Sequence, residues 1–192
     1  IGVGPSGFPL ISYYDSTNAD LKAAYCTDTA CNSTGGTTLV SSGDVGRYTD
    51  LTIGADGLPI IAFWDAAQEL KVVHCGDAPC SAANANVYTI ANTGNAASDS
   101  ISIAVGPDGL PVISFQRADF GALAMAFCSD YACSYARVLF GVDNSTSNTG
   151  QQTSVTIGVD GLPLVTYHDN VNRNLIAAHC PNAFCSPYFH RR

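Results

Sequence analysis

The sequence predicts an all-β protein built from four tandem, four-stranded units of about 50 residues. Three observations support this: a fourfold sequence repeat, short apolar runs bounded by Asp-Gly turns, and one cysteine pair in each unit. We expect the units to form a four-bladed β-propeller, with an open stacked β array as the alternative. The chain is then a single repeat domain, residues 1–192, with units at about 1–48, 49–98, 99–150 and 151–192.

Four segments of the chain align with one another. They are GPSGFPLISYYD from Gly4, GADGLPIIAFWD from Gly54, GPDGLPVISFQR from Gly106 and GVDGLPLVTYHD from Gly158. The second glycines of successive segments lie 50, 52 and 52 residues apart. A period of this length is typical of propeller blades and stacked arrays.

Each unit begins with two strands joined by a tight turn. In units two to four a short alternating run, such as residues 154–157, precedes an Asp-Gly turn, and Leu-Pro with an apolar run such as 60–64 follows it; unit one has Ser6-Gly7 in the turn. Asp-Gly between two such runs is a strong hairpin signal. The second strands are apolar on both faces, so we expect each unit to be covered on two sides.

Two further strands complete each unit. The third strands are expected at residues 21–26, 70–75, 123–128 and 175–180, and the fourth at 38–41, 87–90, 137–140 and 188–192. Both chain ends coincide with unit boundaries, and Ile1 is not a start methionine, so we expect a processed or excerpted chain. Because neither end strand is set aside to complete a distant blade, the open array remains the alternative to a closed ring.

The spacing and the DGLP-x-I-S-Y/F-x-D pattern resemble the tandem repeats of secreted bacterial β-propeller proteins, over essentially the whole chain. The resemblance implies a propeller fold and a secreted protein. The repeats depart from the sialidase Asp box, which has Asp-x-Gly where this chain has Asp-Gly.

The eight cysteines form four pairs, each with four residues between its members. One pair per unit favours a local disulfide between the third and fourth strands, in an oxidising compartment outside the cytosol. Zinc is the alternative, because His74 and His179 precede cysteines, but it needs four converging ligands at each site. The predicted disulfides join Cys26 with Cys31, Cys75 with Cys80, Cys128 with Cys133, and Cys180 with Cys185.

The composition limits the classes of partner. The net charge is −8 and basic residues form no run, which argues against nucleic acid. The longest strongly apolar stretch, residues 58–64, is far shorter than the ~20 residues that span a bilayer, so we predict no membrane span. Charged residues are only 12% of the chain. That surface is either a secreted one of uncharged polar groups or one partly covered by neighbours or glycans.

Candidate ligand-binding residues close the second strands. An aromatic ring beside a carboxylate is a combination that binds sugars, so these positions could contact a carbohydrate. The alternative is that the rings pack between units and the aspartates cap the following loops. Unit three has Gln116-Arg117 instead. The candidates are Tyr14, Asp15, Trp64, Asp65, His168 and Asp169.

Other candidate sites have simpler interpretations. The turn residues Asp56, Asp108 and Asp160 are explained by hairpin chemistry, because calcium needs more oxygen ligands, and we predict neither a metal nor a cofactor. The four histidines do not all share one register and no nucleophile elbow is present, so we expect no catalytic residue. Asn32 and Asn144 begin possible glycosylation sequons.

From these features we predict a non-catalytic, extracellular structural or adhesive repeat protein that assembles with copies of itself into a fibre or surface layer. The alternative is a lectin-like propeller that binds glycans. A glycoside hydrolase is a minor alternative, because aspartates from different units could meet at an axis.

Overall fold

The computed structural model describes residues 1–92, 97–117, 121–142 and 149–186. These residues form four antiparallel sheets and one short 3-10 helix, η1 (Ala82–Asn84), which confirms the all-β prediction. Each sheet comes from one sequence unit and runs in chain order. Sheet 1 contains β1 (Gly2–Val3), β2 (Pro9–Asp15), β3 (Asp20–Cys26) and β4 (Thr34–Val40).

The other sheets repeat this meander. Sheet 2 contains β5 (Val45–Ile53), β6 (Pro59–Asp65), β7 (Glu69–Cys75) and β8 (Ala85–Asn92). Sheet 3 contains β9 (Ala97–Val105), β10 (Pro111–Arg117), β11 (Ala122–Cys128) and β12 (Ala136–Phe140). Sheet 4 contains β13 (Gln151–Ile157), β14 (Pro163–Asp169) and β15 (Asn174–His179). The strand expected at 188–192 lies outside the described residues, and β5 begins before the unit boundary expected at residue 49.

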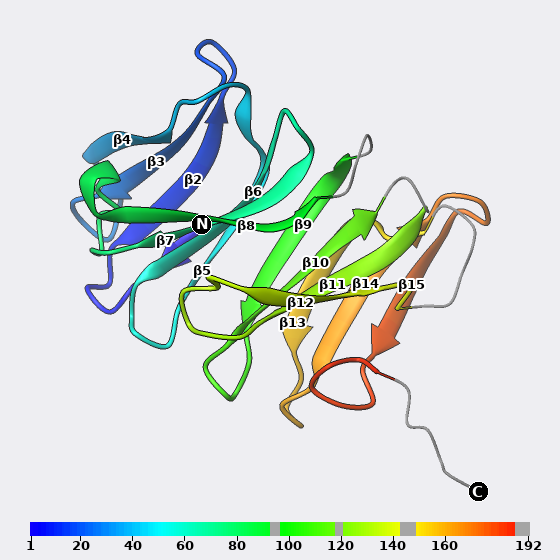
Figure 1. The fold of residues 1–192 in the computed structure, drawn as a ribbon. Helices are drawn as coiled ribbons and strands as arrows, with labels where there is room; N and C mark the ends of the chain where they lie inside the picture. Colours follow the sequence, from blue (N-terminus) through cyan, green and yellow to red (C-terminus); the bar gives the residue numbers. More distant parts are fainter. Residues whose placement is uncertain (93–96, 118–120, 143–148, 187–192) are drawn as a thin grey trace, which may run out of the picture.

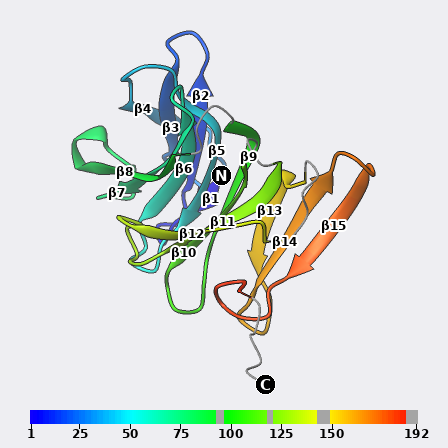
Figure 2. The same cartoon turned by 45° about the vertical axis from the view of Figure 1, so that its right-hand side comes forward.

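The four sheets stand side by side in a row, with sheets 1 and 4 at opposite ends (Figures 1 and 2). The first strand of each later sheet lies against the sheet before it: β5 contacts β2, β9 contacts β5, and β13 contacts β9. In the part of the chain that the structure describes, the row is open, and sheets 1 and 4 do not meet to form a ring.

Hydrophobic clusters fill the spaces between neighbouring sheets. One cluster joins sheets 1 and 2, a second joins sheets 2 and 3, and a third joins sheets 3 and 4. Every residue of β6 and β11 is buried, as expected for strands that are covered on both faces. The two inner sheets therefore have two covered faces, and each end sheet has one.

The repeated turns use the chemistry that their sequence predicts. Gly57 has φ of 79°, a left-handed conformation that glycine adopts without strain, and Gly109 and Gly161 do the same. The carboxylate of Asp56 accepts a hydrogen bond from the backbone N–H of Leu58. Asp108 and Asp160 accept equivalent bonds. These contacts support the interpretation that the aspartates shape the turn.

All four predicted disulfides are present in the structure. Every cysteine of the chain is bonded to its predicted partner, so no free thiolate is left to bind zinc beside His74 or His179. The bonded pairs are Cys26 with Cys31, Cys75 with Cys80, Cys128 with Cys133, and Cys180 with Cys185.

The cysteine-bounded turns share one backbone geometry. In each turn the second cysteine, which is Cys31, Cys80, Cys133 or Cys185, has a positive φ, and its N–H donates to the carbonyl of the residue three positions earlier. A side chain at that earlier position caps the turn. Asp77 accepts from the N–H of Ser81, and Asp130 from that of Ser134. The cysteine pair and its capping side chain thus close the turn together.

Candidate functional site

The third-strand leucine has the same register in every unit but a different environment in the last one. Leu21, Leu70 and Leu123 are 0% exposed, because each packs against the following sheet. Leu175, at the equivalent position of β15, is 80% exposed. Sheet 4 therefore leaves uncovered the face that the other three sheets bury.

We call this surface the tail face. Its counterpart on sheet 3 is fully covered by sheet 4 and includes Leu123, Met125 and Phe127. In sheet 4 the same side of β14 is half-buried and the same side of β15 is exposed. The tail face consists of Ser154, Leu164, Thr166, His168, Leu175, Ala177 and His179.

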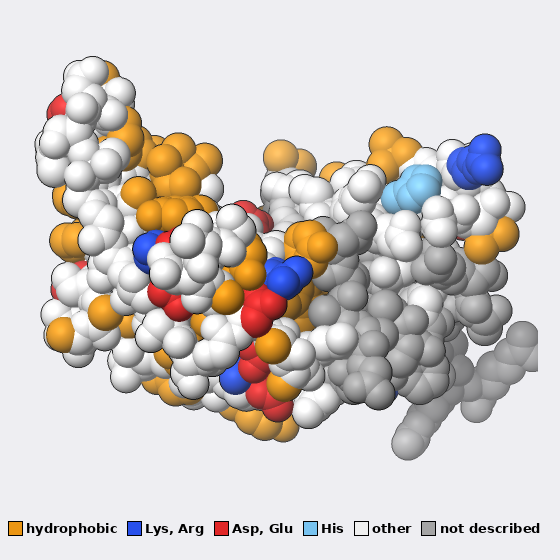
Figure 3. All heavy atoms as spheres, turned by 90° about the horizontal axis from the view of Figure 1, so that it is seen from above, with side chains coloured by type: hydrophobic (Ala, Val, Ile, Leu, Met, Phe, Trp, Pro, Cys, Tyr) orange, Lys and Arg blue, Asp and Glu red, His pale blue; other side chains and the backbone are white. Residues whose placement is uncertain are grey.

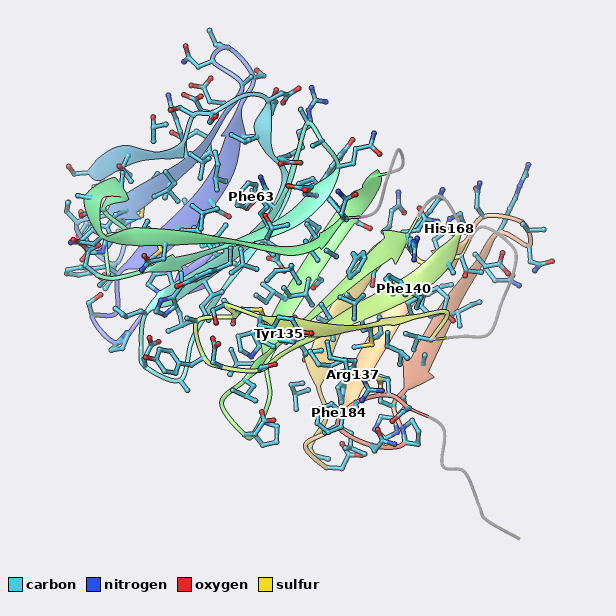
Figure 4. All side chains as sticks on the ribbon, in the orientation of Figure 1. Phe63, Tyr135, Arg137, Phe140, His168 and Phe184 are labelled. Carbon is cyan, nitrogen blue, oxygen red and sulfur yellow. A yellow bond between two sulfur atoms is a disulfide. The ribbon has the colours of Figure 1, made fainter. Side chains whose placement is uncertain are left out.

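Sheet 1 presents the complementary surface at the other end of the row. In sheet 2 this surface includes Ile61 and Phe63, both fully buried against sheet 1, and Figure 4 labels Phe63 in that region. The equivalent Tyr13 of sheet 1 is 39% exposed. We call this surface the head face; it consists of Ile1, Val3, Ile11 and Tyr13.

Each interior interface matches polar with polar and apolar with apolar. The hydroxyl of Thr49 donates to that of Ser12 between sheets 1 and 2, and a buried Thr153–Ser114 pair does the same between sheets 3 and 4. Between sheets 2 and 3 the corresponding positions are both apolar: Ala62 and Ile101 belong to one cluster. Thr166 of sheet 4 holds the repeat position of Ser12, Ala62 and Ser114, and it lies on the tail face.

In sheets 2 and 3 a side chain of the first strand also binds the backbone of the next first strand. Asp50 accepts from the N–H of Ile103, and Ser102 accepts from the N–H of Val155. Ser154 holds the same position in sheet 4 and is exposed. The tail face thus carries the polar groups, as well as the apolar ones, that join one sheet to the next.

The aspartates named as ligand-binding candidates cap the loops that follow them. Asp15 accepts from Lys22, from Asn18 and from the N–H of Thr17, and these bonds, that of Lys22 first, hold the pKa of its carboxyl below the usual range. Asn172 similarly lowers the pKa of Asp169. Asp65 accepts from the N–H of Glu69 and pairs with Lys71.

The rings at the preceding positions have different environments. Trp64 is 1% exposed and packs edge to face on Phe115, so its ring is not available to stack on a sugar. The Tyr14 hydroxyl donates to Asp44, and Arg47 lies 5.2 Å from the centre of the Tyr14 ring. His168 is half-buried at the upper end of sheet 4 (Figure 4). Sugar binding at Tyr14 and His168 stays a prediction.

The remaining candidate residues do not converge on one site. His74 bonds Asp56 at 2.8 Å and His179 bonds Asp160 at 2.9 Å, each within its own sheet. In the described part of the chain no three metal-ligating side chains meet, and no helix is long and apolar enough to cross a membrane. Asn32 is exposed, whereas Asn144 lies outside the described residues.

Sequence reasoning did not identify the head and tail faces as sites. The available signal was that sheet 4 keeps Leu164 and Leu175 at positions that earlier units use for contact with the next unit. On the surface seen in Figure 3, charged side chains of both signs lie next to one another among uncharged ones. Charge therefore does not distinguish a site on that surface.

Comparison with solved structures shows a likeness of fold. The intramolecular trans-sialidase from Ruminococcus gnavus, in complex with oseltamivir carboxylate, is similar over 83% of this chain and 36% of its own, with a TM-score of 0.54 and 15% identity. The endo-1,4-beta-xylanase from Bacteroides thetaiotaomicron is similar over 87% and 67%, with a TM-score of 0.46 and 14% identity. No family model and no curated protein matches the sequence. The chain thus spans about a third of the trans-sialidase, and the likeness concerns the fold alone.

Proposed function

We propose that this protein is a non-catalytic extracellular structural module that assembles head to tail, the tail face of one copy covering the head face of the next. The four sheets would then act as blades of a propeller-like row that continues from copy to copy. The observation that carries the proposal is the exposure of Leu175, 80% against 0% for its three counterparts.

The interior interfaces provide the physical argument. A tail-type surface meets a head-type surface three times within the chain, and each time the leucine of the third strand is fully buried. Uncovered apolar surface of this kind is costly in water and is used for contacts between proteins. Because the two faces differ, each added copy leaves a new tail face free, and such an association grows into a fibre unless its geometry closes a ring.

The setting fits an extracellular role. Four disulfides persist in an oxidising compartment, and charged residues form only 12% of the chain.

The test compares Leu175→Arg with Val171→Arg. Val171 is also exposed and apolar but lies in the loop between β14 and β15. We expect the parent chain and Val171→Arg to grow with concentration in sedimentation velocity and to form fibres in electron micrographs, and Leu175→Arg to remain monomeric. A parent chain that stays monomeric at high concentration contradicts assembly. If Leu175→Arg grows as the parent does, the tail face is not the surface through which copies associate.

A second candidate function, carbohydrate binding, is favoured by one observation. A surface hollow of about 270 Å³ lies beside Asp65 and is lined by the exposed ring of Tyr48, the ion pair of Asp44 with Arg47, and Gln68. An exposed ring with carboxylates and an amide is a suitable set of groups for sugar hydroxyls and C–H faces. A glycan panel probed with the parent chain and with Tyr48→Ala tests it: no binding by the parent, or equal binding by the variant, contradicts this site.

A further inference from the structure

A cavity of about 150 Å³ lies between sheets 3 and 4, at the end of the sheets where the Asp-Gly turns lie. Pro107, Val112 and Phe127 line it from sheet 3, and Ile157 and Phe184 line it from sheet 4. Its walls are almost wholly apolar. A protein cavity of roughly this volume and lining is large enough to bind one benzene ring.

The cavity lies at an interface where two repeat positions carry different residues from those at the preceding interface. Between sheets 2 and 3, His74 bonds the turn residue Asp56 and packs against the ring of Tyr131, 5.7 Å away. In sheet 3 the position of His74 is taken by Phe127, which cannot bond a carboxylate, and in sheet 4 the position of Tyr131 is taken by Ala183.

An aromatic ring reaches this interface from a neighbouring position instead. Phe184, one residue after Ala183, packs edge to face on Phe127 with ring centres 5.8 Å apart. Phe184 is 50% exposed, and the guanidinium of Arg137 lies 6.0 Å from its ring centre. Figure 4 shows Arg137 and Phe184 together at the lower end of the molecule. The one-residue shift leaves space beside the two phenylalanine rings.

Asp108 gives the cavity a negatively charged rim. Its Oδ1 accepts from the N–H of Leu110, as in the other turns. At Asp56 and Asp160 the second carboxylate oxygen is bonded to a histidine, but at Asp108 no described residue takes that place. A carboxylate oxygen next to aromatic rings favours a cation, as does the net charge of −8.

We propose that this cavity binds one small aromatic amine, with its ring against Phe127 and Phe184 and its ammonium group at the carboxylate of Asp108. The proposal is independent of assembly, because the cavity lies between two sheets of one chain and not on the head or tail face. Benzylamine is a suitable probe, and benzyl alcohol is its neutral counterpart of the same size.

The experiment titrates the full chain with each probe and follows the ring signals of Phe127 and Phe184 by NMR. We expect benzylamine to bind with a Kd of about 1 mM, which is ordinary for so small a ligand. Asp108→Asn keeps the acceptor for Leu110 but removes the charge, so it should weaken benzylamine binding about tenfold and leave benzyl alcohol binding unchanged.

Two further variants restore features of the preceding repeat. Ala183→Tyr introduces the ring found at Tyr131, and Phe127→His recreates the pair seen at His74 and Asp56. Both should abolish binding of either probe. Lack of saturable binding by the parent, or unchanged binding by both of these variants, overturns the proposal that the cavity is the binding site. Equal benzylamine affinity in Asp108→Asn overturns the role of the carboxylate. Leu175→Arg should bind benzylamine as the parent does. The binding result is therefore independent of whether the protein assembles.

Discussion

The carboxylate of Asp50 in sheet 2 accepts a hydrogen bond from the backbone N–H of Ile103 in sheet 3, with Oδ2 and N 2.9 Å apart. Ile103 lies on β9, whose other side pairs with β10, so this N–H points from the sheet edge toward the preceding sheet. A buried N–H at an edge needs an acceptor. The side chain of one unit thus completes the backbone hydrogen bonding of the next.

Asp50→Ala should destabilise the protein by about 1–3 kcal/mol, because it leaves the Ile103 N–H without its acceptor. Asp50→Ser should recover most of the loss, since Ser102 makes the same bond to Val155. Urea unfolding of the three proteins measures the difference. An unchanged midpoint for Asp50→Ala would show that this bond does not contribute.

Leu123→Ala and Leu175→Ala make the same chemical change at equivalent positions of successive units. Leu123 is fully buried, so its truncation should cost about 2–5 kcal/mol. Leu175 is exposed, so the cost in the dilute monomer should stay within about 0.5 kcal/mol. Urea unfolding at low protein concentration checks both values. Equal losses would mean that another part of the chain covers Leu175 in solution.

Cys26→Ala with Cys31→Ala removes one disulfide on the outer side of sheet 1. The two cysteines are five positions apart, and opening so small a loop should lower the unfolding free energy by about 2 kcal/mol on the chain-entropy account. Urea unfolding with and without a thiol reductant tests this. The reductant should also destabilise the parent, by more than the double variant loses. A parent protein insensitive to reduction would contradict a stabilising role for the disulfides.

Acid should lower the free energy of unfolding because it protonates Asp15. The bonds from Lys22 and Asn18 lower the folded-state pKa of Asp15, so its contribution is fully present above the unfolded-chain pKa of about 4 and is lost as the pH falls through the lower folded value. Asp15→Asn should therefore be less stable than the parent at pH 7 but lose less between about pH 4 and pH 2. Urea midpoints across that range give the comparison. Lys22→Gln, which keeps the carboxylate, should show a smaller acid loss than the parent. Parallel profiles for all three proteins would contradict the assignment to Asp15.

The sequence predicted the elements of each unit because their causes are local. Asp56 and Gly57 define a turn by backbone geometry, and β7 begins and ends close to the predicted positions. The disulfides followed from the even spacing of the cysteines. Loop capping by Asp15 and Asp169 was one of two stated interpretations, since a carboxylate just before a loop of Asn and Thr has donors within a few residues.

The environment of a side chain between sheets was not predictable in the same way. Trp64 and Tyr14 occupy one repeat position, yet the indole is buried against Phe115 while the phenol bonds Asp44. The difference depends on which residues the neighbouring sheet contributes. A repeat alignment does not contain that information.

By itself, the sequence determined the all-β fold, the four units, their turns and their disulfides, because each depends on residues close together in the chain. Only the tertiary structure decided which faces are covered. Leu123 and Leu175 are the same residue in the same register, and one is buried while the other is exposed because burial depends on whether a neighbouring sheet lies against it. The cavity beside Phe127 has a similar origin, since its volume results from how Phe184 packs across the interface.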